Sequence, residues 1–350
     1  MSPAVRERPV GGDGPVGRVR RRDMLGLSIG LMVSACARRG TSLREATSPP
    51  PTALHIEPLV GLVPSAGLAW LVLARPVELW ANPVMHRVTS ILLPTERFEA
   101  FAATHGGMDF RRAQEAVAAG FEGSSMVLVR APVRGENLVS AFSSRAVQVV
   151  GRASEGGITH VWGTSGDGDD HGEELVVFGD QAAGWERGRC RALRAAALFA
   201  RRRLRRARAA FDAEPLSFAS IALGDAPIRA FAPGPFVGGL ASGLGGLLGA
   251  ATAVAASLRP TPDAELIFDL AVFGAWERDG EAAADRLTAV FDILAADSIG
   301  HLLGVDRPIT GPRTWLRDGA IRLEVTLEAD AVAHGLHSIA DATIDEIMAY

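Results

Sequence analysis

Residues 321–328 read Ile-Arg-Leu-Glu-Val-Thr-Leu-Glu, and this stretch decides the expected fold. Apolar side chains alternate with polar ones along its whole length. Because successive side chains of a β-strand point to opposite faces, this period of two predicts a strand with one buried face and one face in water. The alternation is typical of antiparallel sheets, since the strands of parallel sheets are buried on both faces and are apolar throughout.

Working outward from this strand, short apolar runs predict further strands and longer periodic runs predict helices. The expected strands are 68–74, 126–130, 147–150, 158–162, 174–178, 216–223 and 266–273. The expected helices are 83–93 (capped by Asn82, with Pro83 in its first turn), 95–104, 110–119, 185–211, 236–258, 279–303 and one after residue 329. In both halves of the sequence, a predicted strand is followed by a long helical segment and then by another predicted strand. The expected fold class is therefore α+β, a mainly antiparallel sheet with long helices, in two loosely related modules at residues 59–225 and 226–350.

The N-terminal residues have the layout of an export signal. The arginines at 20–22 precede an uncharged run that is too short to span a bilayer, and the small residues Val33 and Ala35 come just before Cys36. We expect residues 1–35 to be this signal. The alternative is a chance cysteine in a buried N-terminal helix.

The same residues resemble two known kinds of signal. Val33-Ser34-Ala35-Cys36 resembles the lipobox of bacterial lipoproteins, and the run that begins at Arg21-Arg22 resembles a twin-arginine signal, with Met24 where that signal usually has Phe. The resemblance implies cleavage before Cys36, a diacylglycerol on its sulfur, and attachment to a membrane of the cell envelope, facing the periplasm or the cell surface.

Residues 36–58 follow as an expected tether, because they lack hydrophobic periodicity and contain three consecutive prolines, 49–51, which favour an extended chain. If Cys36 carries lipid, Cys190 is the only other cysteine and no internal disulfide can form. We expect Cys190 to be a small buried hydrophobe.

The composition of 48% apolar and 22% charged residues is typical of a globular protein. The formal net charge of −4 argues against a nucleic-acid partner. All 36 basic residues are arginine, so an abundance of arginine alone says little about anion recognition.

The expected helix 185–211 has an apolar stripe and a surface crowded with arginine. The densest part is Arg201, Arg202, Arg203, Arg205 and Arg206. Such a helix could lie against anionic lipid headgroups. In the structural alternative, which we favour, the arginines of this helix balance the negative charge of residues 260–350. That segment contains 17 acidic residues and 6 arginines, a net charge of −11 (6 − 17).

Residues 236–258 carry no charge and have the length of a membrane span. Glycine and alanine dominate them, so we expect a buried helix; a transmembrane helix and the wall of an apolar groove are the alternatives.

Two candidate metal sites have simpler interpretations. Asp330, His334, His337 and Asp341 share one helix face and could bind a divalent metal. The opposite face is apolar, however, so we favour the solvated face of an amphipathic helix over a metal site. The loop 167–172 has the composition of a calcium loop but lacks its final glutamate, which favours a turn between two strands.

The sequence contains no recognisable catalytic motif. A phosphate-binding loop requires lysine, which the chain lacks, and neither a nucleophile elbow nor a dinucleotide fingerprint is complete. The order of strands and helices, with a helix start at Gly107-Met108-Asp109, is similar to that of uncharacterised bacterial envelope proteins with repeated strand–helix modules, and this similarity implies no catalytic residues.

We therefore expect a lipid-anchored envelope protein without a cofactor. Its expected role is structural, interaction with an envelope protein, or binding of an apolar ligand. The alternative is a periplasmic hydrolase whose site is assembled from distant residues.

Overall fold

The structure is a computed structural model. It describes residues 54, 56, 58–164, 172–189, 191–201, 224–263, 265–276, 278–297, 300 and 304–339. These belong to one compact unit, residues 51–350. The export signal, Cys36, Cys190, the loop 167–171 and the expected strand 216–223 lie outside the described residues, so the predictions made for them stay predictions.

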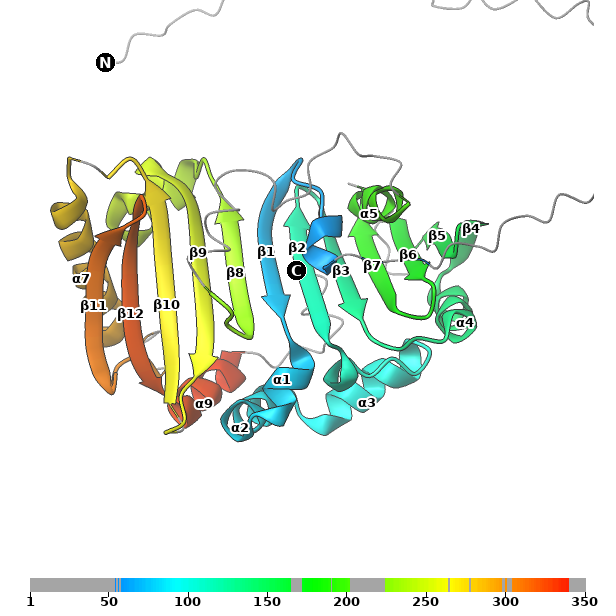
Figure 1. Cartoon of the computed structure of the whole chain (residues 1–350), viewed down its shortest axis with the longest axis horizontal. Coiled ribbons are helices and arrows are strands. Elements are labelled where there is room, and N and C mark those ends of the chain that lie inside the picture. The colour runs from blue at the N-terminus through cyan, green and yellow to red at the C-terminus, as the bar shows by residue number, and fades with distance from the viewer. Residues whose placement is uncertain are drawn as a thin grey trace, which may run out of the picture. The chain divides into compact units, whose positions relative to one another are not determined.

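One antiparallel sheet of 12 strands forms the body (Figure 1). Its strands, in the order in which they lie side by side, are β11 (Thr310–Arg317), β12 (Ala320–Glu328), β10 (Glu265–Gly274), β9 (Ala251–Pro260), β8 (Ile228–Pro233), β1 (Leu68–Ala74), β2 (Glu115–Phe121), β3 (Ser124–Arg130), β7 (Ala182–Gly188), β6 (Gly172–Phe178), β5 (Ile158–Thr164) and β4 (Gln148–Glu155). The predicted alternation at 321–328 is confirmed, because Ile321, Leu323, Val325 and Leu327 are buried while the residues between them are not.

Helices cover both faces of this sheet. The α-helices are α1 (Pro76–Ala81), α2 (Pro83–Leu92), α3 (Thr95–Thr104), α4 (Gly135–Arg145), α5 (Ala192–Ala200), α7 (Gly280–Ala296) and α9 (Ala329–Ile339). The 3-10 helices are η1 (Leu59–Leu62), η2 (Phe110–Arg112), η4 (Gly238–Ser242) and η5 (Leu244–Ala250). Met126 and Leu128 of β3 pack in one core with η1 and α5, while Val127 and Val129 pack in a second core with α3 and α4. Since neighbouring residues of a strand point to opposite faces, these two cores lie on opposite sides of the sheet.

The expected fold class, α+β with a mainly antiparallel sheet and long helices in two modules, is wrong, because the body is one large antiparallel sheet with short helices. Strands from both segments belong to one sheet, because β1 pairs with β8 in antiparallel register from Leu71↔Phe231 to Ala74↔Ile228. The helices are short. The longest one described, α7, has 17 residues. No helix in the described part of the chain is long and apolar enough to cross a membrane.

The order of strands is related on the two sides of the β1–β8 pair. On one side β1, β2 and β3 follow one another, and on the other side β8, β9 and β10 do so. In each half a helix, α4 or α7, follows the third strand and leads to an edge strand, β4 or β11. The strands that follow fill the space between this edge strand and the third strand. They are β5, β6 and β7 in the first half and β12 in the second.

Several elements are predicted correctly from the local sequence. The strand 68–74 and the helix 95–104 have the predicted bounds. The Asn82 side chain caps α2 as expected, since its Oδ1 accepts hydrogen bonds from the backbone N–H of Val84 (3.0 Å) and Met85 (3.1 Å).

Three predicted helices are wrong. Residues 110–119 hold only the turn η2 before β2 begins, and residues 185–188 belong to β7, so the helix expected at 185–211 begins at Ala192 as α5. Residues 236–258 form η4, η5 and most of β9. Gly238, Gly245 and Gly246 have positive φ, which is incompatible with a continuous right-handed helix.

A buried carboxylate holds the start of α5. Arg191, which precedes α5, has a left-handed backbone (φ 61) and provides no side-chain cap. Glu186 of β7, only 3% exposed, fills this role: its Oε2 accepts the N–H of Leu193 (2.6 Å) and its Oε1 accepts the hydroxyl of Ser124 (2.6 Å). A carboxylate at the N-terminus of a helix also interacts favourably with the helix dipole.

Replacing Glu186 with alanine should lower the free energy of unfolding by about 2 to 3 kcal/mol, because two buried donors lose their acceptor. Urea denaturation measures this loss. The matched control is Glu122→Ala in the exposed β2–β3 turn, which should cost less than about 0.5 kcal/mol. Equal losses in the two variants would contradict the capping role.

Candidate ligand-binding site

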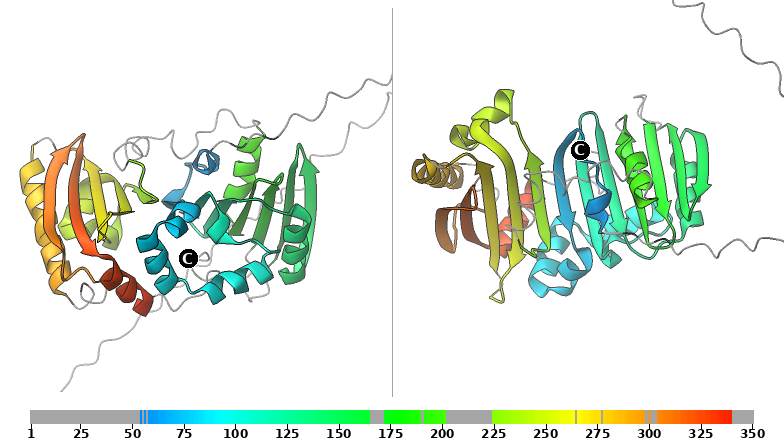
Figure 2. Two further views of the ribbon diagram at one scale, coloured as in Figure 1. Left: turned by 60° about the horizontal axis from the view of Figure 1, so that its bottom comes forward. Right: turned by 45° about the horizontal axis from the view of Figure 1, so that its top comes forward.

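An apolar cavity of about 280 Å³ lies between β1–β3 and the helical segment α1, α2, α3 and η2. In Figure 2, left, these blue and cyan helices follow one another beside the strands. The lining residues from the strands are Val72, Ala74, Ala116, Val117, Ala118 and Val127, of which Val117 has its side chain in the core on the opposite face of the sheet. The side chains from the helical segment include Leu79, Trp80, Leu93, Phe98 and Phe110.

Small residues in the strands account for the empty space. Ala74, Ala116 and Ala118 lie side by side on the part of the sheet that the aromatic side chains of Trp80 and Phe98 cover. Ala74, Trp80 and Ala118 are only half-buried, so this space is a pocket that opens to solvent and is not a sealed void in a core. Its lining is almost entirely apolar, which favours an apolar occupant.

The charged group of the lining is already neutralised. The guanidinium group of Arg111 donates two hydrogen bonds to the carboxylate of Asp109, at 2.8 Å each, and lies 5.6 Å from the ring centroid of Phe98. The hydrogen bond from Arg111 lowers the pKa of Asp109 and raises the pKa of Arg111. Because both groups stay ionised and paired, the cavity offers no net charge to a ligand.

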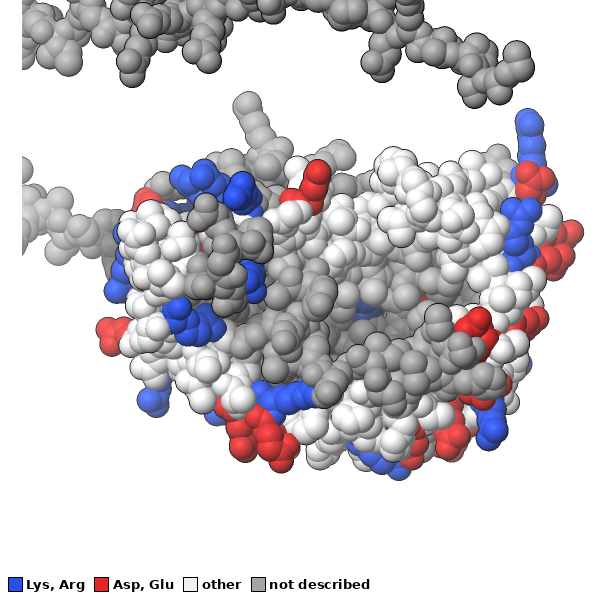
Figure 3. Space-filling model, turned by 180° about the vertical axis from the view of Figure 1, so that it is seen from behind, with Lys and Arg blue, Asp and Glu red and all other residues white. Residues whose placement is uncertain are grey.

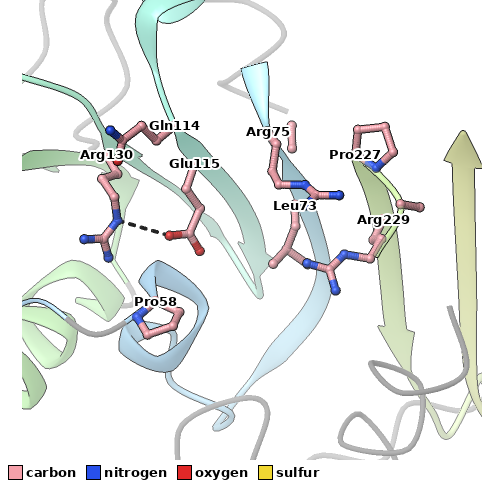
Figure 4. Close-up of a pocket in the computed structure, with 10 residues that line it drawn as sticks. Pro58, Leu73, Arg75, Gln114, Glu115, Arg130, Pro227 and Arg229 are labelled. Carbon is pink, nitrogen blue, oxygen red and sulfur yellow. Dashed lines mark hydrogen bonds and ion pairs between the residues drawn. The ribbon is translucent and has the colours of Figure 1, made fainter. Parts of the chain in front are cut away.

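A second pocket, of about 300 Å³, lies at one end of the central strands β1, β2, β3 and β8 (Figure 4). Glu115 and Arg130 are direct partners on β2 and β3, and Arg130 Nε lies 3.2 Å from Glu115 Oε2. The same carboxylate accepts the N–H of Leu59 (3.0 and 3.1 Å), and the guanidinium donates to the carbonyl of Ile56 (3.3 Å). This ion pair therefore fastens the segment that leads into η1.

The two other arginines of this pocket also have acidic neighbours. Arg75 is paired with Asp225 (2.9 Å) and Glu78 (3.1 Å). Burial, and then the nearby charge of Arg75, lowers the pKa of Arg229, while Asp225 and Glu115 oppose this shift. Three carboxylates thus accompany the three guanidinium groups, so the pocket presents no excess positive charge to an anion.

The titratable group with the largest shift, His105, has a structural role. Its ring stacks on Phe101 (3.8 Å between centroids, 10° between planes), Nδ1 lies 3.1 Å from the Phe101 carbonyl, and Arg145 contacts Nε2. Burial, and secondly the charge of Arg145, lowers the pKa of His105 from 6.5 to about 3. Only 4% of the residue is exposed, so it packs the second core and faces no ligand.

The free energy of unfolding should fall by a few kcal/mol as pH drops from about 6.5 to about 3. Within this window the unfolded state binds a proton at His105 that the folded state excludes, because the pKa is lower in the folded state. Urea titrations at several pH values measure the slope. His105→Gln should remove this part of it, whereas substitution of the exposed His86 by Gln should leave it; equal slopes in both variants would refute the assignment.

The structure places some of the residues that the sequence singled out. Arg201 pairs with Glu155 of β4 (3.1 Å), so this arginine faces the sheet. Residues 202–206 lie outside the described residues, as does Asp341.

Two of the candidate metal ligands are engaged in other contacts. Asp330 pairs with Arg87 (2.7 Å), and His334 Nδ1 donates to the carbonyl of Asp330 (2.7 Å). His337 is exposed. No group of three or more His, Cys, Asp or Glu suited to a metal occurs among the described residues.

For a hydrolase, the nearest candidate is His160, whose Nε2 lies 2.9 Å from Glu174 on the neighbouring strand. In the described part of the chain neither side chain is hydrogen-bonded to a serine, threonine or cysteine. A histidine–carboxylate dyad would activate such a nucleophile, and the described residues place none against this pair.

Comparisons with protein families, curated proteins and solved structures find no match to this chain. The sequence prediction missed the apolar cavity because residues 110–119 were expected to be a helix. A signal for it is the alternation in β2, where the small Ala116 and Ala118 share one face.

Proposed function

We propose that this protein is a lipid-anchored protein of the cell envelope whose body binds a small apolar ligand in the cavity between β1–β3 and α1–α3. The cavity is the observation that carries the proposal. The lipobox-like cysteine and the expected tether support the location, since a lipid on Cys36 would hold the body near a membrane, where apolar molecules concentrate.

The size and chemistry of the cavity define the class of ligand. An apolar cavity of about 150 Å³ in a protein core stays dry and binds benzene. The present cavity, at about 280 Å³, is nearly twice that size and suits a neutral two-ring compound or a short alkyl chain. Because Arg111 is paired with Asp109, a charged head group gains nothing by entering.

Naphthalene, a neutral two-ring probe, should bind saturably to residues 51–350, the compact unit that contains every core described above. Ala118→Phe fills the cavity and should weaken binding at least tenfold, as measured by calorimetry. Ala116→Leu is a smaller filling variant that guards against overpacking, and both variants should unfold cooperatively in thermal melts.

The control for these variants is Ala153→Phe on the exposed strand β4, which should bind naphthalene as the unaltered protein does. Absence of saturable binding in the unaltered protein, or unchanged affinity in both cavity-filling variants, would reject the proposed ligand site.

The lipid anchor has its own test. The full chain expressed in a bacterium should incorporate radiolabelled palmitate and fractionate with membranes, and Cys36→Ala should abolish the label because the thioether cannot form. Cys190→Ala is the matched control and should remain labelled. An unlabelled parent chain, or label that persists in Cys36→Ala, would remove the anchor from the proposal.

A further inference from the structure

An uncharged protrusion precedes β9. It comprises residues 235–250, with η4 and η5, and we call it the glycine-rich protrusion. Val237 is 71% exposed and Leu240 is 65% exposed, and both are large aliphatic side chains. Residues 230–258, which include the protrusion, contain no Asp, Glu, Lys, Arg or His. Viewed from behind, an uncharged surface covers the upper right of the molecule, on the side of β9 and β10 (Figure 3).

The base of the protrusion is firmly packed. Leu247 of η5 is 2% exposed and belongs to the same core as Ala284 and Leu287 of α7. At Gly245 a Cβ atom would lie 2.8 Å from Val290 Cγ2, so the backbone there approaches α7 closely. The contact between η5 and α7 therefore keeps these aliphatic side chains exposed to water. Their exposure is unfavourable in free energy, and a partner surface that covered them could offset it.

We infer that the glycine-rich protrusion docks onto a lipid bilayer, with Val237 and Leu240 entering the boundary between head groups and acyl chains. This inference rests on the proposed function, because the lipid on Cys36 brings the body to the membrane. Burial of apolar side chains at this boundary is the general basis of interfacial binding.

The chemistry of the protrusion favours a bilayer over a protein partner. Protein interfaces have a polar rim around their apolar core. Residues 230–258 contain no charged side chain that could form such a rim. Val237 and Leu240 provide apolar side chains for a bilayer, and the charged side chain that approaches the protrusion, Arg286 of α7, lies against Gly245 at its packed base.

The length of chain between the anchor and the body permits this contact. From Cys36 to Leu54, which already packs against the body, there are 18 peptide units (54 − 36), which span at most roughly 60 Å when fully extended. The body can thus turn any of its faces to the membrane, and the protrusion would select one orientation.

Flotation with neutral phosphatidylcholine vesicles tests the inference on residues 51–350, which lack both the export signal and Cys36. The unaltered unit should float with the vesicles, and the double variant Val237→Asp/Leu240→Asp should show at least a tenfold lower partition coefficient. Both replaced side chains are exposed, so thermal melts should confirm that the variant folds. The matched control is Val150→Asp, whose side chain on the edge strand β4 is 60% exposed, and it should float like the unaltered unit.

Any of three flotation results would overturn the inference: no flotation of the unaltered unit, equal flotation of the double variant, or flotation only with anionic vesicles, which would point to arginine instead. Self-association through the protrusion without vesicle binding would also overturn it and identify a protein partner. Since Cys36 is absent from the tested unit, these results are independent of palmitate labelling, which tests the anchor alone.

Discussion

Backbone pairing between β1 and β8 is the constraint on which the rest of the structure depends. The four residue pairs from Leu71↔Phe231 to Ala74↔Ile228 join strands that are far apart in the sequence into one sheet. Without this pairing both strands would present unpaired N–H and C=O groups in the middle of the protein, at a substantial cost. The pairing also makes one core continuous across the junction, because Leu71 and Leu73 pack in the same cluster as Phe231 and Ala253.

The same strand serves both sides of the sheet. Leu71 and Leu73 face the core beneath η1 and α5, while Val72 and Ala74 line the cavity beneath α1–α3. A one-residue shift in the register of β1 would exchange these two sets. The Glu115–Arg130 ion pair at the end of the neighbouring strands holds the segment that leads into η1, so the cavity and this segment both lie against β2 and β3.

The sequence predicts secondary structure correctly where the signal lies within the element itself. It does not predict elements whose structure depends on pairing with strands that are distant in the sequence. Alternation at 321–328 and the cap at Asn82 depend on near neighbours, and both are confirmed. Residues 115–121 are a strand because β1 and β3 pair with them, although their alanines suit a helix equally well. The sequence showed residues 236–258 to be uncharged, but the positive φ values that break them into short turns became visible only in the structure. The cavity combines residues from 72 to 127, so the alternation of small residues in β2 is only one part of the signal for it.

Because β8 lies so late in the chain, the order of synthesis matters for this fold. β1 can pair with β2 as soon as residues 68–121 are available, but its other edge has no strand beside it until residues 228–233 have been made. Contacts this distant in sequence slow folding and prolong the exposure of strand edges. The N-terminal half is thus the part of the newly made chain most in need of protection from aggregation, and its vulnerable edge is the one that β8 later covers.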